Sequence, residues 1–206
     1  VFDSQPCAIV NSFTINKNDK SSCEGTSVYN DLILYEIHDE ESGSGGTITL
    51  YNGTATTKVL SNYRIYRAGT AVSGTYSNYA TLTGSIAPGA IGIIKVTPSD
   101  CGPASTNGSI NSGFNANDGI QLRNATGSIV IDDVNVPSSS AGYFMKRVSG
   151  AYTANSIYVA SDWTSISLAT GQCATGLAVL PAASGGNSPL ITAQPAYSPN
   201  CGSVVL

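Results

Sequence analysis

The single histidine of the chain, His38, lies in its most acidic stretch, residues 36–41, which read Glu-Ile-His-Asp-Glu-Glu. A histidine beside carboxylates can act as a general base or bind a metal ion. A Ser-His-Asp hydrolase usually places its serine in a G-x-S-x-G turn, and this sequence has none. Metal-dependent nucleases and proteases normally need more imidazoles than one. We therefore predict no catalytic residue and place His38 in a solvated loop before the glycine- and serine-rich residues 42–46.

Paired carboxylates are the next candidate, because two of them can hydrolyse a glycosidic bond. Asp132 and Asp133 are adjacent in a stretch with strand character. Neighbouring side chains of a strand point to opposite faces, so these two carboxylates cannot share one substrate. Catalysis by this pair is not expected.

Calcium binding is a better hypothesis than catalysis for the acidic residues, although no EF-hand-type loop is present. A hard cation prefers carboxylate and amide oxygens, and such oxygens occur at two places in the chain. The residues that could supply them are Asp39, Glu40, Glu41, Asn117 and Asp118. We expect no cofactor, with calcium as the open alternative.

The five cysteines, Cys7, Cys23, Cys101, Cys173 and Cys201, are widely spread. Structural zinc needs clustered Cys and His ligands, so no metal site is predicted from them. Two pairs bracket short segments near the ends of the chain. We prefer the pairing Cys7–Cys23 and Cys173–Cys201 among the many arrangements possible, which leaves Cys101 as a buried thiol or as a link to another chain.

Surface chemistry could also come from tyrosines and asparagines. Tyrosine rings can stack on sugars, but on strands they are more often half-buried at the edge of a core. We favour the second interpretation for Tyr63, Tyr66, Tyr76 and Tyr79. Three sequons make candidate glycosylation sites at Asn52, Asn107 and Asn124.

The composition of the 206 residues excludes several classes of protein. Charged residues make up 11% of the chain and the net charge is −4. A nucleic-acid binder needs a basic face, which this chain lacks. No apolar run reaches the length of a membrane span. Few charges, 22 glycines and five cysteines suggest a secreted, extracellular or cell-surface protein whose signal peptide has been removed.

Short apolar runs separated by polar turns predict an all-β fold. Helical periodicity is almost absent, apart from a turn near residues 161–163. We expect strands over residues 8–15, 28–37, 46–51, 63–67, 90–96, 120–123, 128–136, 143–148 and 156–159.

Five segments form one pattern when their order and spacing are taken together: 46–54 (GTITLYNGT), 60–65 (LSNYRI), 82–90 (LTGSIAPGA), 113–122 (GFNANDGIQL) and 145–163, ending in Ser-Asp-Trp. This pattern resembles the lamin-tail-type domain of secreted bacterial proteins. Two positions depart from the family pattern: Thr49 stands for a glutamate, and Gly119 for the second turn aspartate. The resemblance implies an immunoglobulin-like β-sandwich with a non-catalytic role in adhesion, targeting or scaffolding.

We therefore predict an Ig-like β-sandwich or barrel with extended N- and C-terminal segments. Its parts are an N-terminal strand segment over residues 1–20, a lamin-tail-like sandwich over 21–170 and a Pro/Gly/Ser-rich extension over 171–206.

The amino-terminal segment offers a route to self-assembly. Ile9, Val10, Phe13 and Ile15 form a strand pattern outside the lamin-tail-like region. Such a strand can complete an open sheet of a neighbouring copy. We expect a non-catalytic structural surface protein that joins copies of itself into a filament or layer. The alternatives are a monomeric carbohydrate- or surface-binding module and the accessory domain of a larger secreted hydrolase.

Overall fold

The computed structural model describes residues 30–41, 45–69, 74–96, 99–110, 113, 115–139 and 141–181. All described residues belong to one compact unit, Thr26–Ser184. The predicted assembly strand over residues 8–15 lies outside them.

The larger of two packed sheets has six strands. Its order is β12 (Trp163–Ser167), β11 (Tyr143–Arg147), β1 (Ile33–Asp39), β2 (Gly46–Tyr51), β7 (Ile91–Val96) and β8 (Ser109–Ile110). Neighbouring strands are antiparallel except for β7 and β8, which run parallel. Consecutive strands β1 and β2 lie side by side, as in a hairpin.

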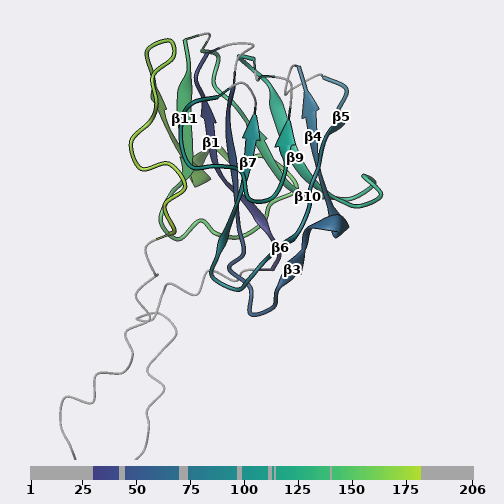
Figure 1. Cartoon of the computed structure of the whole chain (residues 1–206). Helices are drawn as coiled ribbons and strands as arrows, with labels where there is room; N and C mark the ends of the chain where they lie inside the picture. The colour runs from purple at the N-terminus through teal and green to yellow at the C-terminus, as the bar shows by residue number, and fades with distance from the viewer. Residues whose placement is uncertain are drawn as a thin grey trace, which may run out of the picture. The chain divides into compact units, whose positions relative to one another are not determined.

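The smaller sheet has four antiparallel strands. Its order is β10 (Val130–Asn135), β9 (Gly119–Asn124), β4 (Tyr63–Ala68) and β5 (Ser77–Thr81). The short pair β3 (Lys58–Val59) and β6 (Ser85–Ile86) lies at the lower end in Figure 1. The helices η1 (Leu60–Asn62) and η2 (Ala160–Asp162) are single 3-10 turns. In the described ranges, no helix is long and apolar enough to cross a membrane.

The core between the sheets is built from alternate residues of their strands. Ile48 and Leu50 of β2 point inward, as the alternation in the sequence predicts, and Ile65 of β4 and Leu122 of β9 meet them from the smaller sheet. Removal of these side chains from water is the main source of stability. The all-β sandwich is therefore confirmed. The expected strand over residues 156–159 is wrong: this segment is a bend, and Ile157 is 74% exposed.

The outer face of the larger sheet is also covered, which the sequence did not predict. Tyr35, Tyr51 and Tyr152 pack together over β1 and β2. Residues after β12 return across the same face, where Leu168 and Ala174 pack on Phe144. Strands β1 and β2 are consequently buried along their whole length.

One disulfide joins this returning segment to the sandwich. Cys101 and Cys173 are bonded across 72 residues of sequence. The expected Cys173–Cys201 bridge is therefore wrong, and so is the free thiol at Cys101. The predicted Cys7–Cys23 bridge lies outside the described residues. Short sequence separation was a poor guide here, because folding brings the segments that follow β7 and β12 together.

A buried ion pair joins the two sheets along one side. Asp132 of β10 accepts a hydrogen bond from Arg147 of β11 (Nη2–Oδ1, 2.6 Å), and both side chains are almost fully buried. The same carboxylate accepts the amide hydrogens of Leu34 at 2.8 Å and Asn155 at 2.9 Å. Arg147 also donates to the carbonyl oxygen of Leu34 and lies over the ring of Trp163, 4.5 Å from its centre. Every charge in this cluster has a partner.

We expect Asp132→Asn to lower the free energy of unfolding by about 3–5 kcal/mol, because it leaves a buried guanidinium without its main counter-charge. The neighbouring Asp133→Asn is the matched control. Asp133 is half-buried on the opposite face, and its loss should change stability by about 1 kcal/mol or less. Urea unfolding followed by tryptophan fluorescence measures both. Equal losses in the two variants would contradict this role for Asp132.

Removal of the disulfide should destabilise the sandwich by about 4 kcal/mol in the double variant Cys101→Ser/Cys173→Ser, because the bridge closes a long loop. The single variant Cys201→Ser is the control and should leave unfolding of the sandwich unchanged. Non-reducing peptide mapping should recover a cross-linked pair that contains Cys101 and Cys173. A pair that joins Cys173 to Cys201 would contradict the assignment.

Candidate functional site

The four strands at the outer edges of the sheets differ in how well they are protected. An edge strand presents unpaired backbone groups, and natural proteins protect it by short length, bulges, prolines or charges. Strand β8 has only two residues. Strand β10 carries a register shift at Val130/Asp132 and an inward charge at Asp132, and the edge strand β5 has a register shift against β4 at Ile65/Tyr66. These three edges are poor acceptors for another strand.

Strand β12 has none of these protective features. It pairs with β11 in an unbroken register over all five residues and with no other described strand. Its sequence, Trp-Thr-Ser-Ile-Ser, contains no charge and no proline. Trp163 anchors one end in the core, whereas the other four residues are exposed, among them Ile166 at 53%. This edge is able to accept a further strand.

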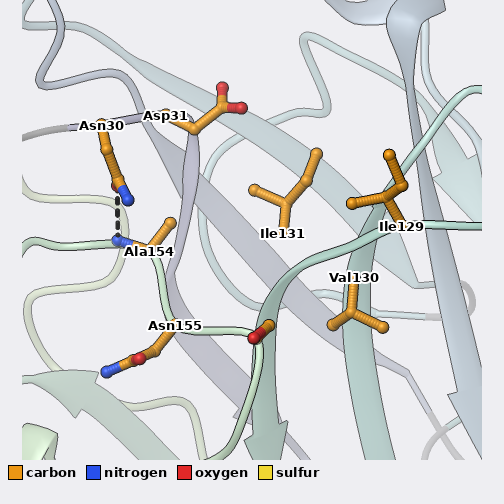
Figure 2. Close-up of a pocket in the computed structure, with 8 residues that line it drawn as sticks. Asn30, Asp31, Ile129, Val130, Ile131, Ala154 and Asn155 are labelled. Atoms are coloured by element: carbon orange, nitrogen blue, oxygen red, sulfur yellow. Dashed lines mark hydrogen bonds between the residues drawn. The ribbon is translucent and has the colours of Figure 1, made fainter.

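A shallow groove of about 350 Å³ lies beside β10. Figure 2 shows Asn30 and Asp31 on one side of it and Ile129 on the other, with the amide of Ala154 donating to Asn30 Oδ1 at 3.1 Å. Asp31 is already engaged by Lys58 at 3.0 Å. None of the described residues that line the groove is aromatic, so it offers no ring on which a sugar could stack.

His38 does not lie in a solvated loop, contrary to the prediction. It is a fully buried residue of β1 on the outer face of the larger sheet, beside the ring of Phe144. Its Nε2 atom accepts the amide hydrogen of Ala174 at 3.3 Å. Burial lowers the pKa of His38 and outweighs the opposite effect of the backbone carbonyl of Gln172. The neutral ring is therefore a structural contact for the segment that follows β12.

Near His38, the ligand atoms of His38, Glu40 and Cys101 lie within 4.8 Å of one another. Cys101, however, is bonded to Cys173, and a disulfide sulfur is not a thiolate ligand. Glu40 Oε1 accepts hydrogen bonds from the hydroxyl of Ser99 and, at 3.4 Å, from the amide of Cys101. In the oxidised protein these groups are occupied in holding the loop before Cys101.

The acidic residues proposed for calcium are separated by the fold into two groups. Glu40 lies beside Ser99, as described above. Asp39, by contrast, ends β1 on the core side of the larger sheet, and Asp118 precedes β9 of the smaller sheet; both are fully buried. Their charges are close enough to raise the pKa of Asp39. Only part of the predicted ligand set is therefore brought together.

The carboxylates of Asp39 and Asp118 differ in the partners that stabilise their negative charge. Asp118 Oδ2 accepts hydrogen bonds from Arg67 Nε at 2.6 Å and from the amide of Asn115 at 2.7 Å. No cation among the described residues pairs with Asp39. Burial first, and then the charge of Asp118, raise the pKa of Asp39 to about 7. The hydroxyl of Tyr143, whose Cα pairs with that of Asp39, is fully buried nearby, and its pKa is raised by burial and by both carboxylates.

The aspartate pair and the four tyrosines lie as predicted from the sequence. Asp132 and Asp133 point to opposite faces, as expected: Asp132 is buried, and Asp133 faces Tyr76. The four tyrosines are buried or half-buried, and the guanidinium group of Arg123 lies 4.5 Å from the ring centre of Tyr66 and 5.3 Å from that of Tyr76.

Two of the three sequons have buried asparagines. The amide nitrogen of Asn52 donates to the carbonyl oxygens of Thr56 at 2.9 Å and Ile86 at 2.8 Å, and that of Asn107 donates to Thr83 at 3.2 Å. A glycan on either nitrogen would disrupt these bonds. Asn124 lies half-exposed at a turn, so it is the accessible site among the three.

Sequence reasoning missed Arg147 and Arg67, the cations that neutralise Asp132 and Asp118. A usable signal was present: the whole chain contains only nine Lys and Arg residues, and Arg67 and Arg147 both lie within predicted strands. A charged residue inside an apolar strand pattern often indicates a buried pair.

No protein-family model matches this chain, and no curated protein is similar to it in sequence.

We expect Asp39→Asn to stabilise the protein at pH 8 in the presence of a chelator. The unfolded chain loses the Asp39 proton near pH 3.8 and the folded chain near pH 7, so stability falls as the pH rises between these values. The asparagine variant lacks this penalty and should be more stable at pH 8 by at least about 1 kcal/mol, with little difference at pH 4. Urea unfolding at both pH values measures this.

The control is Asp100→Asn, which removes an exposed carboxylate and should not change the pH profile. If Asp39→Asn is less stable than the wild type at pH 8 under chelation, the interpretation of Asp39 as a buried, uncompensated carboxylate is wrong.

Proposed function

We propose that this protein is a non-catalytic extracellular structural subunit that assembles with copies of itself into a filament or layer. Residues 1–15 of one copy would add to the open edge of β12 in the next copy. The observation that carries the proposal is the unprotected state of β12. Its register is regular, its residues are uncharged, and its side away from β11 has no described partner.

The proposed donor is chemically suited to this edge. Residues 8–15 read Ala-Ile-Val-Asn-Ser-Phe-Thr-Ile, without a charge or a proline. Uncharged segments with many β-branched and aromatic residues favour strand addition. Main-chain hydrogen bonds would give affinity, while Ile9 or Phe13 could cover the exposed Ile166. A segment given to the next copy makes a head-to-tail contact, which propagates when its rotation does not close a ring.

Three further features support an extracellular structural role. The Cys101–Cys173 disulfide is typical of proteins in oxidising compartments. The lamin-tail-like motifs favour a scaffold or adhesion role. The charged fraction of 11% would leave little repulsion between stacked copies.

The alternative of a carbohydrate-binding module has weaker support. The groove beside β10 has no aromatic lining, and Arg123 lies against the faces of Tyr66 and Tyr76. An accessory domain of a larger secreted hydrolase would need no open edge. Neither alternative accounts for the bare edge of β12.

We expect Ile166→Lys to abolish filaments or layers seen by negative-stain microscopy, because a lysine on an edge strand opposes strand addition. Ile129→Lys is the matched control, since Ile129 is exposed to a similar degree, 60%, beside the protected edge of β10. Deletion of residues 1–15 should give folded monomers. A synthetic peptide of residues 1–15 should bind those monomers and should not bind the Ile166→Lys variant.

Wild-type protein that stays monomeric by light scattering at all concentrations would contradict the proposal. Equal loss of assembly in Ile129→Lys and Ile166→Lys would place the contact elsewhere. Retention by a glycan array together with a monomeric state would favour the carbohydrate-binding alternative.

A further inference from the structure

Asp39 and Asp118 meet at one end of the sandwich core, and each comes from a different sheet. Asp39 is paired through its backbone with Gly46 of β2 and Tyr143 of β11. Asp118 directly precedes Gly119, which pairs with Ala68 of β4. Both carboxylates are fully buried and interact electrostatically. Two buried acidic side chains from opposite layers thus lie close enough for the charge of Asp118 to act on Asp39.

These oxygens have too few hydrogen donors. Both carboxylate oxygens of Asp39, Oδ1 of Asp118 and the hydroxyl of Tyr143 have no hydrogen-bond partner within the described part of the chain. The nearby guanidinium group of Arg67 is bonded to Oδ2 of Asp118. The amide of Glu41 favours the charged form of Asp39 without making a well-formed hydrogen bond to it. Buried acceptors without donors are costly and normally have a positive partner.

We propose that a calcium ion binds between Asp39 and Asp118, with the Tyr143 hydroxyl as a neutral oxygen beside it. The three unpartnered carboxylate oxygens and this hydroxyl supply an all-oxygen set from two rigid sheets. Water molecules complete the six to eight positions that calcium requires. The site would join the layers at one end, in addition to the Asp132–Arg147 pair along the side.

The donor chemistry selects this class of cation. Zinc prefers nitrogen and sulfur ligands, and His38 lies on the opposite face of the same sheet, beside Phe144. Magnesium demands a compact, near-ideal octahedron of oxygens, which side chains fixed on two separate sheets are poorly placed to supply. Calcium tolerates irregular geometry and bidentate carboxylates, so Asp39 can offer both of its oxygens.

The test is a calcium titration of the full chain at pH 7.5 after treatment with chelator. Isothermal titration calorimetry should detect calcium binding that Asp39→Asn weakens at least tenfold. The unfolding midpoint of the wild type should rise by about 5–10 °C at a hundredfold excess over the dissociation constant. Asp100→Asn is the control and should behave as the wild type. Tyr143 pairs with Ser167 of β12, but Ile166 pairs with Phe144, which lies on the outer face of the sheet, away from the core site. Ile166→Lys should therefore bind calcium as the wild type does, which separates this proposal from assembly.

The decisive outcome is that calcium reverses the order of stability of the wild type and Asp39→Asn. In chelator Asp39→Asn should be the more stable protein, because it removes a buried charge; in calcium the wild type should be the more stable. If Asp39→Asn remains more stable in calcium, or gains as much from calcium as the wild type, the proposal is overturned. Stabilisation by sodium or magnesium chloride at matched ionic strength to the same degree as by calcium chloride would also overturn it.

Discussion

The Asp132–Arg147 pair is the interaction on which the rest of the sandwich depends. Its carboxylate comes from the edge strand of the smaller sheet and its guanidinium from the larger sheet, so it fixes their distance along one side. It also accepts the amide hydrogen of Leu34, where β1 has a register shift against β2. The amide of Leu34, beside the bulge in β1, therefore has a hydrogen-bond acceptor. The same guanidinium holds the ring of Trp163, and Trp163 begins β12. The protected edge at β10 and the open edge at β12 are therefore both set by this pair.

Asp39 and Asp132 show that two buried carboxylates can be stabilised to very different degrees. Both are fully inaccessible to solvent, so both lose the hydration of a charged group. Asp132 regains part of it from one guanidinium and two backbone amides, although burial still raises its pKa. Asp39 has burial and the neighbouring Asp118 acting against its charge, and its pKa rises to about 7. The contrast identifies Asp39 as a buried carboxylate whose oxygens have no hydrogen-bond partner in the described part of the chain, which a proton or a cation would supply.

Local patterns were enough to predict much of the fold but little of the chemistry. The alternation of Ile48 and Leu50 with threonines predicts β2, and the adjacency of Asp132 and Asp133 predicts their opposite faces, because both depend only on the two-residue period of a strand. The position of His38 could not be predicted in this way. An acidic run usually indicates a loop, and β1 is buried here because residues 168–177 cover its outer face, as the bond from Ala174 to His38 shows. The Cys101–Cys173 bridge and the Arg67–Asp118 pair likewise depend on contacts between distant segments, which no local pattern contains.

The open edge also sets a physical requirement for the strand that would bind it. Fixing five donor residues opposite β12 costs about 5–10 kcal/mol of backbone entropy. Five main-chain hydrogen bonds would contribute about 0.5–1.5 kcal/mol each, and over most of this range their sum is smaller than the entropy cost. Stable addition therefore needs apolar side chains, each contributing about 1.5–3 kcal/mol when fully buried. Ile166 supplies one exposed apolar surface on β12, and Ile9, Val10, Phe13 and Ile15 supply several on the proposed donor. Polar segments elsewhere in the chain could form the same backbone hydrogen bonds, but they could not provide this burial. The apolar pattern of the first fifteen residues, rather than their capacity to extend, would make them a specific partner for this edge.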